Sequence, residues 1–244
     1  MKRALTIAIC AAVTGLAVAG DQQEGSRGTV LIQRLRGDVT VRHGVTDVWA
    51  SVAVGDALRP DDSMKIGKNG TAVLALSMSK DGTPSVRRIS LPPEVIVDIS
   101  DIRTLTPEEL MLKLTMEKVR ASSYRWREDE LHIPNTSVVH GRNEEVSPAS
   151  RENDPRTGEL QINGARVLFD NGFYSTCALK TMELFRLYPP LGTKFENRLM
   201  MADALSRAAL RSEALTEYSD LSRLEGLTAK QKAVVDKRIA ELKK

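Results

Sequence analysis

The sequence predicts an α+β protein in separate domains, with an all-β region first and an α-helical region after it. Residues 29–100 are rich in Val, Ile, Thr, Gly and Asp, the residue types that favour strands and turns. Residues 160–244 are rich in Ala, Leu, Glu, Lys and Arg, which favour helices. Between them, residues 133–159 carry three prolines among Asn, Ser and Glu, a composition typical of a linker.

The first 19 residues have the composition of an export signal. Residues 1–3 are a short basic head, residues 4–18 are an apolar run, and Ala17-Val18-Ala19 presents small side chains to a signal peptidase. This pattern predicts a secretory signal peptide cleaved after Ala19. The alternative is an uncleaved membrane anchor, although the apolar run is shorter than the roughly 20 residues that span a bilayer. The mature chain is therefore expected to be periplasmic or secreted, without a membrane span.

The charge of the chain argues against a nucleic-acid partner. The formal net charge of +3 falls to +1 once Lys2 and Arg3 leave with the signal peptide. A nearly neutral chain without a long basic run offers few phosphate contacts. Nucleic-acid binding is therefore not expected.

Alternating apolar and polar residues, interrupted by Gly, Asp and Asn, predict a series of short strands. The turn at residues 36–38 joins the first two strands, and the turn at 68–70 is of the kind that closes a hairpin, because Asn and Gly accept positive φ. Trp49 is expected in the core. The inward side of the strand that follows the second turn is either Ala72, Leu74 and Leu76 or the complementary set. The predicted strands span residues 29–35, 39–41, 47–54, 71–78, 86–91 and 95–99.

Residues 37–76 contain a series of short motifs: Gly37-Asp38-Val39, Trp49, Gly55-Asp56 with Leu58, and the alternation of Ala72, Leu74 and Leu76. Their order resembles the FecR-type domain, an all-β module of bacterial cell envelopes that senses or scaffolds without known chemistry. The resemblance implies a β domain over residues 28–121, with a trailing helix. Residues 61–66 depart from the family pattern, because they lack its Gly and Thr. A signal peptide is predicted in place of the antisigma segment and membrane helix of iron-signalling members, so the signalling role is not implied.

A helix is predicted to begin at Thr106, which can cap it, with Pro107 in the first turn and acidic residues facing the positive end of the helix dipole. Apolar residues continue it to about Ala121. We expect this helix to pack on the sheet; the alternative is an exposed stripe for a partner. Residues 122–159 are then the predicted linker.

Residues 160–244 resemble a pair of tetratricopeptide-like helical repeats followed by an end helix that opens at Thr228. Ala178 and Ala214 are 36 residues apart, close to the repeat length of that family. Such repeats usually bind peptides on their inner face. The resemblance therefore implies a protein-binding groove, for which the candidate residues are Asn171, Ser175, Arg198 and Asp203.

The sequence predicts no assembled catalytic or metal site. His43, His132 and His140 are isolated, and the acidic pairs 61–62, 108–109 and 144–145 are adjacent residues whose side chains diverge. Residues 153–159 are interpreted as a turn, with a calcium loop as the weaker alternative. Cys177 is the only thiol of the mature chain, and a buried structural role is favoured over a reactive one.

The predicted function is that of a non-enzymatic, exported cell-envelope adaptor or scaffold without a cofactor. The β domain would associate with the envelope, and the helical repeats would bind envelope proteins of unknown identity. The alternative is a ligand-sensing or cell-wall glycan-binding module. A hydrolase is disfavoured, because no catalytic constellation is recognisable.

Overall fold

The computed structural model describes residues 29–44, 48–80, 83–129 and 154–243. The predicted signal peptide, His132, His140 and most of the predicted linker lie outside these ranges. The order of β region and then helices is confirmed. None of the helices in the described ranges is long and apolar enough to cross a membrane.

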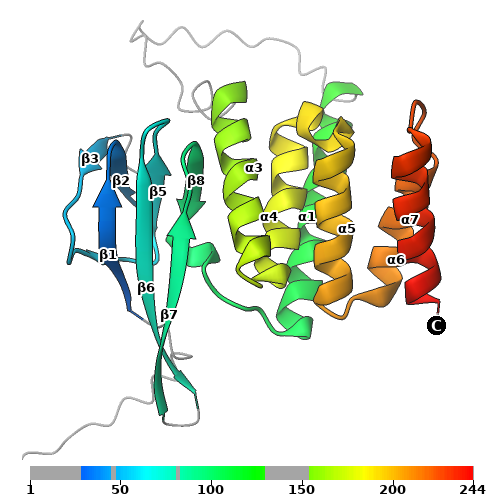
Figure 1. Cartoon of the computed structure of the whole chain (residues 1–244). Helices are drawn as coiled ribbons and strands as arrows, with labels where there is room; N and C mark the ends of the chain where they lie inside the picture. The colour runs from blue at the N-terminus through cyan, green and yellow to red at the C-terminus, as the bar shows by residue number, and fades with distance from the viewer. Residues whose placement is uncertain (1–28, 45–47, 81–82, 130–153, 244) are drawn as a thin grey trace, which may run out of the picture.

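The β region consists of two four-stranded antiparallel sheets (Figure 1). One has the order β4-β1-β6-β7 and the other the order β3-β2-β5-β8. Ala72, Leu74 and Leu76 are buried, so the first of the two predicted inward sets is the right one. The strands are β1 (Val30–Arg36), β2 (Val39–His43), β3 (Trp49–Ser51), β4 (Ala57–Leu58), β5 (Asp62–Ile66), β6 (Thr71–Lys80), β7 (Thr83–Leu91) and β8 (Val95–Asp98).

The two predicted turns connect the sheets rather than strands of one sheet. β1 and β2 belong to different sheets, as do β5 and β6, so the prediction that residues 68–70 close a hairpin was wrong. Gly37 has a φ of +69°, and a Cβ there would lie 2.0 Å from the carbonyl oxygen of Asn69. The two turns therefore pack on each other, which requires a glycine at position 37. Consecutive strands pair with each other elsewhere, as β2 with β3 and β6 with β7.

The helical region begins earlier, and the first helix ends later, than the sequence predicted. α1 runs to Asp129 rather than Ala121, and α3 starts at Pro155, so both ends of the predicted linker are helical. Residues 154–159 are the cap and first turns of α3, in which the Asp154 carboxylate accepts a hydrogen bond from the Arg156 amide at 3.1 Å. The helices are α1 (Pro107–Asp129), α3 (Pro155–Asp170), α4 (Tyr174–Leu187), α5 (Phe195–Arg207), α6 (Arg211–Ser222) and α7 (Ala229–Leu242), with short 3₁₀ turns η1 (Ile99–Asp101) and η2 (Pro189–Thr193).

Both predicted caps are confirmed. The Thr106 hydroxyl accepts a hydrogen bond from the Glu109 amide at 3.2 Å, and Thr228 forms a capping box with Gln231. Ala178 of α4 and Ala214 of α6 are both completely buried. Helices that follow one another from α3 to α7 pack side by side, in a row that leads away from the sheets (Figure 1).

α1 does not pack on the sheet as expected; its main neighbour is α4. Leu110 and Leu114 of α1 are buried, and Glu117 pairs with Arg186 of α4 at 3.0 Å. Ahead of the helix, the Leu105 amide donates a hydrogen bond to the Ser175 hydroxyl of α4 at 2.9 Å. This contact directs the chain past the sheets and into the helical region.

The place next to the sheets is taken by α3, which packs on β8, the last strand of its sheet (Figure 1). A Cβ at Gly164 would lie 1.9 Å from the carbonyl oxygen of Ile96, so only a glycine permits this approach. The Asn163 side chain donates to the carbonyl oxygen of Glu94 at 3.0 Å, and Arg156 pairs with the Glu94 carboxylate. These contacts hold Glu94 at a φ of +59°, which is unusual for a residue other than glycine.

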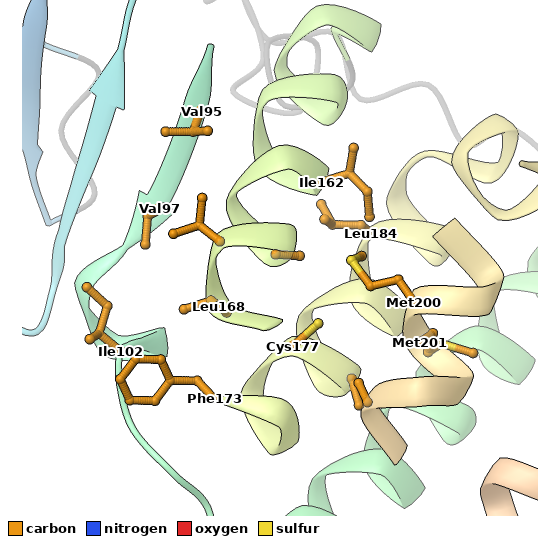
Figure 2. Close-up of a cluster of buried hydrophobic side chains, with 14 of the residues drawn as sticks. Val95, Val97, Ile102, Ile162, Leu168, Phe173, Cys177, Leu184, Met200 and Met201 are labelled. Atoms are coloured by element: carbon orange, nitrogen blue, oxygen red, sulfur yellow. The ribbon is translucent and has the colours of Figure 1, made fainter. Parts of the chain in front are cut away.

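The two regions share one core instead of forming the separate domains that were predicted. A single cluster of buried apolar side chains extends from the sheets through α3 and α4 to α7. Figure 2 shows its middle part, where Val97, Leu168 and Cys177 come from β8, α3 and α4. The β and helical regions therefore form one packed unit.

We predict that Gly164→Ala lowers the free energy of unfolding by about 2–3 kcal/mol, because the added methyl group forces α3 away from β8. Helix propensity acts in the opposite direction, since Ala is favoured over Gly within a helix. Urea unfolding of both proteins measures the difference. A variant as stable as the wild type, or more so, would show that the close approach is not required.

Candidate protein-binding surface

The four candidate groove residues do not line a common open groove. Ser175 is buried in the first turn of α4, where it accepts the hydrogen bond from Leu105. Asn171 caps the end of α3, and its side chain donates to the carbonyl oxygen of Val167 at 2.9 Å. Asn171 also borders a cleft of about 490 Å³ between α3 and the adjoining ends of β6 and β7.

Arg198 and Asp203 join α5 to the helices that follow it. Arg198 pairs with Glu217 of α6 at 3.3 Å. Asp203 accepts a hydrogen bond from the Tyr218 hydroxyl and pairs with Arg238 of α7 at 2.9 Å. Burial and this carboxylate raise the pKa of Tyr218, which therefore remains a proton donor. The side chains of Arg198 and Asp203 therefore form contacts between helices of the same chain. The repeat spacing alone did not distinguish this structural role from partner binding.

A different surface stands out on α1. Met111, Leu112, Met116 and Val119 are 39%, 63%, 46% and 58% exposed. Leu112, Met116 and Val119 follow the i, i+4, i+7 spacing of one helix face, on the side opposite the buried Leu110 and Leu114. These four residues, called the α1 surface below, make up half of the large apolar side chains exposed in the described part of the chain. Contiguous exposed apolar residues are typical of interaction sites.

α7 provides a comparison within the same molecule. It also has one side without a neighbouring helix, but Val235 is its one fully buried residue and its outer side is polar. A polar outer face is what a helix at the end of such a row needs in water. On α1, in contrast, large apolar residues lie among the polar ones on the solvent side. The exposed residues of α7 include Lys230, Lys232, Asp236, Lys237 and Glu241.

A small cleft lies between α1 and α6, on the side of α1 that faces away from the α1 surface. Its volume is about 160 Å³, and Leu114, Met182 and Leu205 supply its apolar side chains. Glu213 and Glu217 of α6 and Lys118 of α1 supply charged groups. The residues of the α1 surface do not line this cleft, so it is not part of that surface.

The sequence held a signal for the α1 surface. In residues 107–121 the apolar residues fall into two sets, Leu110 with Leu114 and Leu112 with Met116 and Val119. At 100° per residue these sets lie on opposite sides of a helix. A helix with two apolar sides needs two partners. The sequence prediction instead assigned all of the apolar residues of this helix to a single contact.

A partly buried group of charges lies where β8 and η1 meet α4. The Lys180 ammonium lies 2.8 Å from Asp98, 3.2 Å from Glu183 and 3.9 Å from Asp101. Burial raises the pKa of Asp101 to about 7, and repulsion by Asp98 and Glu183 adds to the rise that Lys180 opposes. Despite its burial, Asp98 has a lowered pKa because of Lys180 and Ser63. Three carboxylates share the single positive charge of Lys180, which explains why one of them, Asp101, resists ionisation.

Trp49 is half-buried on the outer side of its sheet, so the prediction that it lies in the core was wrong. Its ring lies beneath two cations, with the Arg42 Cζ 5.3 Å and the Lys65 Nζ 5.6 Å from the ring centroid. Alternation along a strand shows which residues share a side, but it does not show which side faces inward. β3 is moreover an edge strand of only three residues.

Cys177 is completely buried, as predicted, and burial raises the pKa of its thiol to about 12. A thiol in this environment is unreactive at neutral pH. The imidazole Nδ1 of His43 lies 2.8 Å from the Asp62 carboxylate. Within the residues that the structure describes, no three His, Cys, Asp or Glu side chains are placed to hold a metal ion.

No protein-family model matches this chain, and searches of curated proteins and of solved structures likewise found no match. The fold therefore defines the class: an α+β protein with two antiparallel sheets followed by packed helices. Its most distinctive surface is the exposed apolar side of α1.

We predict that Asp101→Asn flattens the dependence of stability on pH between about 4 and 7. In the wild type the raised pKa of Asp101 means that the folded protein holds a proton which the unfolded chain releases above pH 4. The free energy of unfolding therefore falls as pH rises through this range, with Lys180, Asp98, Glu183 and Arg103 facing the carboxyl group. Chemical unfolding at a series of pH values measures the slope.

Asp236→Asn, an exposed change on α7, is the control and should retain the wild-type slope. If Asp101→Asn and the wild type had the same slope, Asp101 would not be the group that titrates in this range.

Proposed function

We propose that this protein is a non-enzymatic, exported scaffold of the cell envelope that binds protein through the α1 surface. The observation that carries the proposal is the contrast between α1 and α7. Both helices have one side facing solvent, but that side carries large exposed apolar side chains on α1 and only polar or small exposed side chains on α7. Four large apolar side chains exposed on one helix are unfavourable in water unless a partner covers them.

Rigidity of the unit supports a scaffold role. The shared core, the α3–β8 contact and the Lys180 cluster tie the helices to the sheets. A partner bound at α1 is therefore held in a fixed position relative to the β region. A preorganised surface loses less conformational entropy on binding than a mobile one.

The envelope location rests on sequence. The composition of residues 1–19 supports export, and the resemblance of residues 37–76 to FecR-type domains supports an envelope role for the β region. The resemblance of residues 160–244 to tetratricopeptide-like repeats supports binding of protein rather than of a small molecule.

Site-specific photo-cross-linking in intact cells tests this function. A benzophenone amino acid at position 112 should form protein adducts with a yield at least about tenfold above that at position 237, because apolar contact areas dominate protein interfaces. Position 237 is the control, since Lys237 is exposed on the polar side of α7. Cell fractionation of the same cultures should recover the processed chain outside the cytoplasm. Equal, low yields at both positions, or an unprocessed cytoplasmic chain, would contradict the proposal.

A second candidate function is glycan binding by the outer side of the β3-β2-β5-β8 sheet. An aromatic ring flanked by Arg42 and Lys65 favours it, because such a surface suits a sugar polymer that carries negative charge. The nearby Thr40 and Ser51 hydroxyls add hydrogen-bonding groups.

If this second function is correct, Trp49→Ala should reduce the amount of protein that sediments with purified cell wall by roughly tenfold. Val86→Ala, which changes an exposed residue of β7, is the control and should sediment like the wild type. Failure of the wild-type protein to sediment with cell wall would remove this candidate.

A further inference from the structure

We propose that the partner at the α1 surface is a second copy of this chain, whose α1 helix lies antiparallel to the first across a twofold axis. This inference rests on the proposed function, since it specifies what the α1 surface binds. A twofold interface requires one patch that is complementary to itself. The α1 surface meets that requirement both in its apolar residues and in its flanking charges.

The apolar residues are arranged symmetrically about the middle of the helix. Leu112 and Val119 lie at similar distances on either side of the midpoint between Thr115 and Met116. When a second α1 runs in the opposite direction through this midpoint, Leu112 of each copy faces Val119 of the other. The two Met116 side chains then meet near the axis, where their flexibility allows close packing.

The charges beside this face select the antiparallel direction. Glu109 and Arg120 are 11 residues apart, about three turns, and therefore lie on the same flank of the helix. In an antiparallel pair the flank of one copy meets the same flank of the other. Arg120 of the second copy then lies level with Met111, two residues or about 3 Å along the helix from Glu109, a distance that two long side chains can span. The contact occurs twice. In a parallel twofold pair the two flanks would lie on opposite sides of the interface, so Glu109 would not meet Arg120.

Both charged groups are accessible for this contact. The side chains of Glu109 and Arg120 are 34% and 58% exposed. Arg120 pairs with Glu117 in its own chain, but Glu117 also pairs with Arg186 of α4 and so does not depend on Arg120. Glu109 lies 2.8 Å from Arg103 and 3.4 Å from Lys113, both more than a third exposed. The surroundings of Glu109 are thus open to a further cation.

A single-cysteine experiment tests the arrangement on the full mature chain. Met116→Cys places a thiol next to the twofold axis, so mild oxidation should convert most of the protein into a disulfide-linked dimer. Cys177 does not interfere, because it is completely buried. Lys118→Cys is the matched control on the same helix; position 118 is exposed but about 160° around the helix from position 116 and directed toward α6. It should remain monomeric under the same oxidation.

Sedimentation analysis of variants tests the energetics. Leu112→Gln combined with Met116→Gln should raise the dissociation constant of the dimer by roughly 30-fold, through the loss of apolar burial. The midpoint of thermal unfolding, measured at a concentration at which both proteins are monomeric, should be unchanged because both side chains are exposed in the monomer. Glu109→Arg and Arg120→Glu should each weaken the dimer, and the double variant should restore it. Restoration is specific to the antiparallel pair.

Three results would overturn the inference, and they are distinguishable from failure of the proposed function. A monomer at all concentrations whose position 112 cross-links to another envelope protein contradicts the dimer but leaves protein binding at α1 intact. Cross-linking of position 112 to residues 130–153 of the same chain shows that this segment covers the surface. A monomer without adducts at position 112 contradicts both proposals.

Discussion

The approach of Gly164 in α3 to the carbonyl oxygen of Ile96 is the constraint on which the rest of the architecture depends. A helix that lies directly on the edge strand β8 joins the sheets to the helical row without a flexible connection. Glu94 is held in a left-handed backbone conformation beside this contact by Asn163 and Arg156. The partly buried Lys180 group forms at the same junction, so electrostatics and packing fix the two regions in one orientation.

The position of α3 also determines what α1 can contact. Because α3 occupies the side of β8, the chain after η1 leads past the sheets, and α1 packs on α4 through Leu110 and Leu114. A helix placed in this way has one covered side. Its second apolar side, with Leu112, Met116 and Val119, faces solvent. The interaction surface is thus a consequence of how the β and helical regions are joined.

Features that depend on neighbouring residues could be predicted from the sequence, whereas features that depend on distant partners could not. The caps at Thr106 and Thr228, the alternation along β6 and the buried Cys177 follow from local chemistry and periodicity. The placement of β1 and β2 in different sheets could not be predicted in this way. A turn shows that the chain reverses direction, but it does not show which strands pair. Trp49 and Ser175 were misplaced for the same reason: their surroundings are set by segments far away in the chain. The α1 surface was within reach of sequence reasoning, since its two apolar phases are visible in residues 110–119.

The use of β8 as the platform for α3 has a consequence for aggregation. Each sheet has two edge strands, which can pair with strands of other molecules when they are long and unprotected. Here β8 is covered, while β3 and β4 have only three and two residues. β7, with nine residues, is the long edge strand that remains, and it carries Pro84, Arg87 and Arg88. Proline removes a backbone donor and arginine adds charge, so the edge most open to strand addition is also the one whose sequence opposes it.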